Sequence, residues 1–221
     1  GASVQALNEA SYPPLVALCS ISSTTLQQST ALDIVQLLLN KGAKVSSTYD
    51  NGMTALSNAA HAGQVLVMKT LLLNGSNYDH QMSNGWTPLM AAADGISSSC
   101  KDAVQFLIEE GAQLNNRSKK GWTALHAASR RGRDDITKIL LMANAKFFKS
   151  SVIKPKNDRL YNASGGLTCL HLAAYEGYIE VVRVIVEHMD FEENEVSKAN
   201  SNDNNNNNLN INNNSSSSSS S

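Results

Sequence analysis

The sequence has few of the features that mark secreted, membrane-spanning or metal-binding proteins. It contains only three cysteines, and Cys19, Cys100 and Cys169 are odd in number, far apart in the sequence and without metal-ligand spacing, so we expect neither a disulfide scaffold nor a metal site. No apolar run approaches the ~18 residues that a membrane span needs, and no basic and apolar leader precedes the first segment expected to fold. We therefore expect an intracellular protein, in the cytoplasm or the nucleus, with no metal, no other cofactor and no membrane partner.

Net charge and aromatic side chains are also low. The net charge of −1 gives the whole chain no attraction for nucleic acid or an anionic membrane. Aromatic residues make up only 5% of the chain, while alanine and leucine carry most of the 42% that is apolar. This balance favours small, closely packed helices over a β-sandwich.

Sequence motifs for catalysis are missing as well. There is no Gly-rich phosphate loop after a predicted strand, no H-E-x-x-H and no C-x-x-C. His61, His80 and His188 have no companions at metal-ligand spacing. We therefore expect that the protein is not an enzyme.

Two short phrases recur in step along the chain. The first is a glycine, a small residue, any residue and an apolar residue, and its starts are separated by 41, 33, 36 and 33 residues. It begins at Gly1, Gly42, Gly75 and Gly111, and in a weaker form at Asn144. The second reads GMTALSNAA, GWTPLMAAA, GWTALHAAS and GLTCLHLAA, from Gly52, Gly85, Gly121 and Gly166. A period near 33 with two interlocking phrases indicates a repeat array.

Each repeat predicts a pair of helices. A threonine is placed to cap the first helix, and the pattern Leu-x-x-Ala-Ala puts Leu56, Ala59 and Ala60 on one close-packing face. The capping threonines are Thr54, Thr87, Thr123 and Thr168. The second helix carries apolar residues at i, i+3 and i+4, in the sets Ile34, Leu37, Leu38; Met68, Leu71, Leu72; Val104, Leu107, Ile108; Ile136, Ile139, Leu140; and Val182, Ile185, Val186. Gly42, Gly75, Gly111 and Asn144 are expected to end it in the left-handed conformation.

These patterns resemble the ankyrin repeat family, whose core motif is T-P-L-H-x-A-A. The closest matches are TPLMAAA (Thr87–Ala93), TALHAAS (Thr123–Ser129) and TCLHLAA (Thr168–Ala174). The resemblance covers roughly Gly1 to His188. It implies an all-α solenoid of stacked helix-turn-helix units with β-hairpin-like fingers. It also implies that His126 and His171 hold the helix start and the adjacent loop by hydrogen bonds.

Three segments are expected along the chain. Residues 1–10 read as the tail of a preceding repeat, residues 11–191 as an array of about five units, and the Asn- and Ser-rich residues 192–221 as a disordered tail or linker. Extra residues fall between the helices of the first and third units (SISSTTLQQST and ISSSC) and at a finger edge (Lys149–Gly165). They are either tolerated loop variation or, near Phe148 and Tyr161, an extension of the binding surface.

The resemblance also implies where a partner binds. In this family, contacts gather after the finger glycine, at the finger tip before it, and at the end of the first helix. The candidate partner-binding residues are therefore Met53, Trp86, Trp122 and Leu167 after the glycines; Asn51, Asn84, Lys119 and Lys120 at the tips; and Arg130, Arg131 and Tyr175 at the helix ends. We expect the post-glycine residues to form an exposed apolar row with the two indoles as anchors. The alternative is that both indoles simply pack across adjacent fingers.

Basic residues gather on the fourth unit. Lys119, Lys120, Arg130, Arg131 and Arg133 predict a basic patch on which an acidic or extended peptide docks. The alternative is a solvated charged surface.

The sequence thus favours a monomeric, non-enzymatic protein–protein interaction module. It would bind a partner protein or peptide on the face formed by the fingers and first helices. One alternative is the targeting or regulatory segment of a longer enzyme, such as a ubiquitin ligase or kinase. A weaker one is nucleic-acid binding through the basic fourth repeat.

Overall fold

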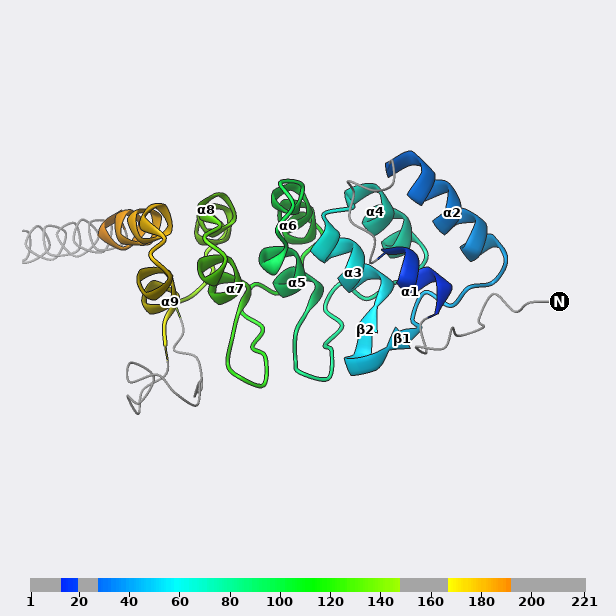
Figure 1. The fold of residues 1–221 in the computed structure, drawn as a ribbon, viewed down its shortest axis with the longest axis horizontal. Helices are drawn as coiled ribbons and strands as arrows, with labels where there is room; N and C mark the ends of the chain where they lie inside the picture. Colours follow the sequence, from blue (N-terminus) through cyan, green and yellow to red (C-terminus); the bar gives the residue numbers. More distant parts are fainter. Residues whose placement is uncertain (1–12, 20–27, 148–166, 192–221) are drawn as a thin grey trace, which may run out of the picture.

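The computed structural model describes residues 13–19, 28–147 and 167–191, and these form five stacked helix pairs. The first helices are α1 (Pro14–Cys19), α3 (Ala55–Ala62), α5 (Pro88–Asp94), α7 (Ala124–Arg130) and α9 (Cys169–Glu176). The second helices are α2 (Gln28–Asn40), α4 (Val65–Leu73), α6 (Cys100–Glu109), α8 (Asp134–Met142) and the helical residues 179–191. Figure 1 shows the first helices in one row, most of the second helices in a row above, and loops projecting below. The predicted all-α solenoid is confirmed.

Local sequence sets the ends of these helices as predicted. The hydroxyls of Thr54, Thr87 and Thr168 accept hydrogen bonds from the backbone N–H three residues on, which satisfies a donor that the helix itself leaves free. After the second helices, the left-handed positions are Gly42 (φ 87°), Gly75 (φ 89°), Gly111 (φ 91°) and Asn144 (φ 64°). No atom lies within 4 Å of a Cβ placed on any of the three glycines, so their backbone conformation, and not space, selects glycine.

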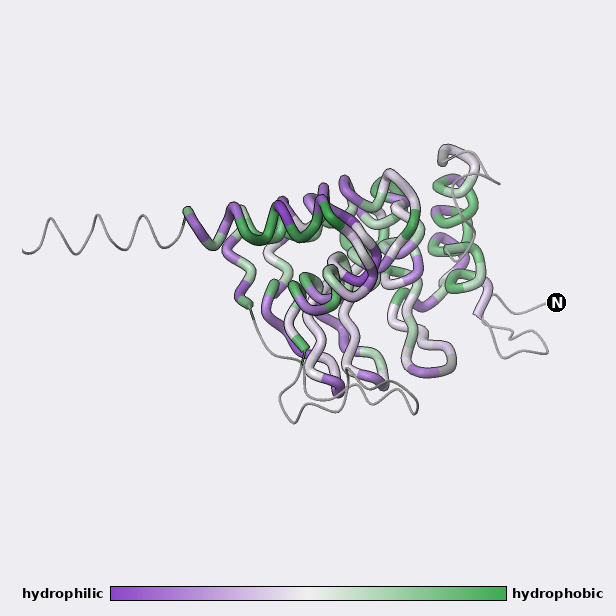
Figure 2. The backbone as a smooth tube through the Cα atoms, turned by 60° about the vertical axis from the view of Figure 1, so that its left-hand side comes forward, coloured by the Kyte–Doolittle hydropathy of each residue, from purple (hydrophilic) through white to green (hydrophobic). Residues whose placement is uncertain are grey.

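The loops between helix pairs are hairpin-like fingers. In the first, β1 (Thr48–Tyr49) pairs antiparallel with β2 (Met53–Thr54) around the short turn η1 (Asp50–Gly52). In the next two, the N–H groups of Met82 and Ser118 donate to the carbonyls of Trp86 and Trp122, both at 2.8 Å. Neighbouring fingers are also joined, since Ser83 N–H donates to Asn51 C=O (2.7 Å) and Lys119 N–H donates to Asn84 C=O (2.9 Å). Hydrophilic residues lie at the finger tips (Figure 2).

Alanines and leucines form the core. The paired alanines of the first helices, such as Ala59–Ala60 and Ala92–Ala93, are fully buried, so successive first helices pack closely. In the second helices, Met68, Leu71, Val104 and Leu107 are also fully buried, as their spacing predicted.

The predicted apolar face of α2 is partly wrong. Ala31 and Val35 are buried, but Ile34 is 36% and Leu37 is 57% exposed. Phe106, at the position equivalent to Leu37, is buried and lies under the Lys69 ammonium of the preceding second helix, 5.5 Å from its ring centroid. The described residues contain no helix pair before α1 and α2, so Leu37 has no corresponding neighbour.

Of the predicted insertions, ISSSC falls at the loop between α5 and α6 as expected, and its last residue, Cys100, begins α6. Of SISSTTLQQST, residues 20–27 lie outside the described residues, and the last three residues begin α2. The insertion Lys149–Gly165, Phe148, Tyr161, residues 1–10 and residues 192–221 also lie outside the described residues, so the expected array of residues 11–191 is described only in part. None of the helices seen in the described ranges has the length and apolar content to cross a membrane.

Candidate functional site: a groove between the fingers and the first helices

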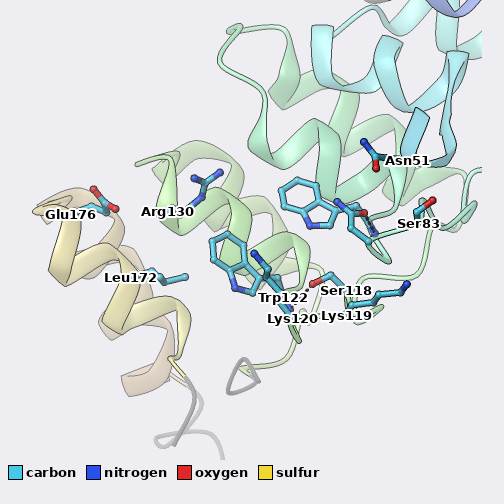
Figure 3. Close-up of a pocket in the computed structure, with 11 residues that line it drawn as sticks. Asn51, Ser83, Ser118, Lys119, Lys120, Trp122, Arg130, Leu172 and Glu176 are labelled. Atoms are coloured by element: carbon cyan, nitrogen blue, oxygen red, sulfur yellow. Dashed lines mark hydrogen bonds between the residues drawn. The ribbon is translucent and has the colours of Figure 1, made fainter. Parts of the chain in front are cut away.

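A groove of about 740 Å³ lies where three fingers meet the first helices of the fourth and fifth units (Figure 3). Its finger side comes from the loops before α3, α5 and α7, and its helix side from α7 and α9. The described residues that line it are Asn51, Ser83, Asn84, Trp86, Ser118, Lys119, Lys120, Trp122, Arg130, Leu172 and Glu176.

The groove brings together many of the residues predicted from the sequence. Asn51, Asn84, Trp86, Lys119, Lys120, Trp122 and Arg130 all line it. Met53, Leu167, Arg131 and Tyr175 are not among its described lining residues. Ser83, Ser118, Leu172 and Glu176 also line the groove and were not among the candidate residues. Leu172 and Glu176 are four residues apart on α9, so the helical period would have revealed their shared face once a first helix was assigned to the site.

The two indoles stack on each other across neighbouring fingers. The ring centroids of Trp86 and Trp122 are 6.5 Å apart, with 30° between their planes. Trp86 is half-buried, but Trp122 is only 7% exposed, so the expected exposed apolar row is wrong at Trp122. Trp122 also stacks on the His126 ring (6.4 Å) and lies under the Arg130 guanidinium (5.2 Å to the ring centroid). Trp86 is therefore the more accessible of the two indoles.

Short polar side chains fix the backbone at both tryptophans. The Asn84 side-chain oxygen accepts from Trp86 N–H at 2.9 Å, and Ser118 Oγ accepts from Trp122 N–H at 3.0 Å. Such local bonds are why Asn and Ser are common in turns. They hold the fingers in place before any partner arrives.

The arginines of the predicted basic patch are held by other groups of the protein. The buried Asp94 carboxylate accepts from Arg130 Nη2 (2.6 Å) and from Arg131 Nε (2.9 Å) and Nη2 (2.8 Å). Arg133 Nη1 donates to the carbonyls of Gly95 (2.6 Å) and Ser97 (3.1 Å). The patch is thus less basic than the sequence suggested, and these contacts fasten the α5–α6 loop to the fourth unit.

The protonation of this network follows from its hydrogen bonds. Bonding to Asp94 raises the pKa of Arg131, so it stays charged. Burial alone would raise the pKa of Asp135, but hydrogen bonds from Arg133 and from the Ile136 backbone N–H outweigh it and lower that pKa. Arg131 and Asp135 are therefore both charged at neutral pH.

The two lysines differ from the arginines. Lys119 and Lys120 are exposed at the finger tip and form no ion pair with any residue that the structure describes. The same holds for the exposed Glu176 at the end of α9. Figure 3 shows the lysines and Glu176 on opposite sides of Trp122.

The motif histidines have the structural role that the resemblance implied. His126 Nδ1 accepts from Thr123 N–H (3.3 Å) and lies 2.9 Å from the Thr123 hydroxyl oxygen, while its Nε2 is 3.3 Å from the Leu167 carbonyl of the next finger. His171 makes the equivalent contacts to Thr168. The His126 ring therefore joins the helix start to a loop, whereas the contacts of His171 lie at the helix start.

The three cysteines are buried free thiols. Burial raises the pKa of Cys19 and of Cys169 to about 12, and it also raises that of Cys100. Because the thiolate is the reactive form, all three thiols are unreactive at neutral pH. Within the described ranges, no three His, Cys, Asp or Glu side chains are grouped to hold a metal ion.

Stacked helix pairs with hairpin-like fingers and a groove between fingers and first helices define a class of solenoid repeat proteins. Comparison with protein families makes this specific. A family model for "Ankyrin repeats (3 copies)" matches residues 25–118 and 67–151, and one for "Ankyrin repeat" matches residues 165–194. The chain belongs to the ankyrin repeat family.

Two curated relatives show that such arrays occur within larger proteins. The chain is 30% identical over 160 residues to the human SH3 and multiple ankyrin repeat domains protein 2, covering 72% of this chain and 8% of that protein. It is 33% identical over 122 residues to the glycerophosphocholine phosphodiesterase gde1 of Schizosaccharomyces pombe, covering 54% of this chain and 10% of that protein. The chain thus spans about a tenth or less of the length of either relative.

Proposed function

We propose that this chain is a protein–protein interaction module that holds a segment of a partner protein in the groove between the fingers and the first helices. Trp86 is the side chain that contacts the partner segment, and it stacks on the buried Trp122. Membership of the ankyrin repeat family supports protein binding in general. The groove supplies the specific surface.

The observation that carries this proposal is the stacked indole pair in a groove lined by polar side chains. Trp is enriched at binding hot spots because it buries a large, rigid area at a low entropy cost. Trp86 is half-buried, so part of its ring remains for a partner to cover. Bonds to the finger backbone hold it in place, which reduces the ordering cost on binding.

Selection from a display library of random 12-residue peptides tests the proposal. The selected peptides are measured against the wild type, Trp86→Ala and a matched control, Leu73→Ala. Leu73 is 88% exposed on α4 and lies outside the groove, so the control also removes apolar surface. Circular dichroism checks that all three proteins are equally helical.

We expect Trp86→Ala to weaken binding by about 30-fold or more, equivalent to about 2 kcal/mol, and Leu73→Ala to leave it unchanged. A Trp86→Phe variant should be intermediate, because it retains an aromatic ring. Binding that survives Trp86→Ala but fails in Leu73→Ala would move the binding surface to the second helices and contradict the proposal.

A second candidate is that the module targets or regulates an enzyme in the same polypeptide. The match to a phosphodiesterase of which this chain covers only a tenth supports it. It is compatible with groove binding, because the partner segment then comes from the enzyme itself. Nucleic-acid binding has less support, since Arg130 and Arg131 are paired with Asp94.

A further inference from the structure

The charges around the groove are unevenly compensated. At its helix end, Arg130 and Arg131 share the Asp94 carboxylate, which leaves one positive charge in excess. Glu176 supplies one further negative charge at this end, so the four groups balance.

The finger end has no such balance. Lys119 and Lys120 are adjacent, exposed and without a carboxylate partner among the residues placed by the structure. Both line the groove, on the far side of Trp122 from Glu176 (Figure 3). The groove therefore has two uncompensated positive charges at one end, an apolar centre and a neutral opposite end.

We propose that the partner segment carries an apolar side chain with acidic residues on one side of it only. The apolar side chain lies against Trp86, and the acidic residues meet Lys119 and Lys120. Acidic residues on the other side would meet the neutral end, where no uncompensated positive charge attracts them. This inference rests on the proposed function of the groove and adds the chemistry of its occupant.

A peptide fits this distribution better than a nucleic acid does. A nucleic-acid strand carries a negative charge at every nucleotide, so some phosphates would meet the balanced end and Glu176. A peptide can place its charges at one end and leave the rest of its length neutral.

The test repeats the 12-residue peptide selection on the wild type and on Lys119→Glu/Lys120→Glu. A second double variant, Lys41→Glu/Lys44→Glu, is the control: it changes the net charge equally, at exposed lysines outside the groove. Circular dichroism again verifies folding. A labelled 12-nucleotide single-stranded DNA is measured in parallel.

On the wild type and the Lys41/Lys44 variant, we expect peptides with an apolar residue and Asp or Glu clustered to one side. On the Lys119/Lys120 variant, the acidic residues should be replaced by Lys or Arg at the same distance from the apolar residue. A wild-type peptide should bind the Lys119/Lys120 variant about tenfold or more weakly, and its affinity for the wild type should fall with salt.

The possible failures are distinguishable. Enrichment of the same sequences on the wild type and the Lys119/Lys120 variant, with Trp86→Ala still abolishing binding, overturns the acidic-segment inference and leaves the groove function intact. Enrichment that is independent of Trp86 overturns both. DNA binding that is lost in both Trp86→Ala and the Lys119/Lys120 variant, with no peptide enriched, assigns the groove to nucleic acid and overturns both.

Discussion

The fourth and fifth units carry nearly the same first-helix motif, TALHAAS and TCLHLAA, yet they bury it to different extents. His126 is 1% exposed, whereas His171 at the equivalent position is exposed. Ser129 is fully buried and Ala174 is exposed. In the second helices, Leu141 is 1% exposed, while the equivalent Val186 is 41% exposed.

The difference shows that the next unit buries these side chains, and that the motif alone does not determine how exposed they are. In the fourth unit, α7 packs against α9, and α8 lines one shallow hollow together with residues 184–188. His126 also lies within 3.3 Å of the Leu167 carbonyl of that following unit. Among the residues that the structure describes, no helix pair follows residues 179–191. In a solenoid, each unit is stabilised by its neighbours, so equivalent substitutions should differ in cost between the two units.

The largest expected difference lies in the core leucine of the first helix. Leu125 is 1% exposed, and its equivalent Leu170 is only partly buried. Leu125→Ala should lower the free energy of unfolding by about 2–5 kcal/mol, because it leaves a cavity, and Leu170→Ala by clearly less. Urea unfolding followed by circular dichroism measures both. If both variants lost the same free energy of unfolding, burial by the next unit would not determine how much stability the substitution removes.

The motif histidines give a smaller contrast. His126→Ala removes the acceptor for Thr123 N–H, the link to Leu167 and the ring stacked on Trp122. We expect a loss of about 1–3 kcal/mol, as for other buried groups left without their partner. His171→Ala should cost less, since water can replace the lost bond at an exposed site. Thermal unfolding compares the two variants, and a larger effect at His171 would reverse the comparison.

Removing an ion pair should also cost more stability at the fourth unit than in the fifth. Asp94→Asn weakens the neutralisation of Arg130 and Arg131 and should cost about 1–2 kcal/mol, because the carboxylate is buried while the arginines are partly exposed. In the fifth unit, Glu180 and Arg183 form a pair that is 60% exposed on both sides. Glu180→Gln should change stability by less than about 0.5 kcal/mol. Similar costs in urea unfolding would show that Asp94 is not a junction between units.

The smallest expected effect depends on pH. Asp135, the equivalent of Glu180, has its pKa lowered from 3.8 in the folded state. It therefore contributes stability above the unfolded pKa, and this contribution is lost as the pH falls through the lower folded pKa. Asp135→Asn should be less stable than the wild type at pH 6, and the difference should shrink below about pH 4. A difference that stays constant with pH would assign the effect to packing.

Local sequence determined the repeat, the helix pairs and their ends. A capping hydroxyl and its N–H partner are three residues apart, and a left-handed glycine needs no neighbour, so both follow from a few adjacent residues. The finger positions follow from the period, so the sequence indicates that Trp86, Lys119 and Lys120 share one face, and all three line the groove.

Only the tertiary structure decided how accessible and how charged those side chains are. Trp122 is buried because Trp86 and Arg130 cover it, and Arg130 and Arg131 are paired with a single carboxylate 36 and 37 residues earlier. Likewise, Leu37 is exposed where the equivalent Phe106 is buried. Burial and ion pairing depend on atoms of neighbouring units, and a motif that repeats with little change does not specify which neighbours each copy will contact.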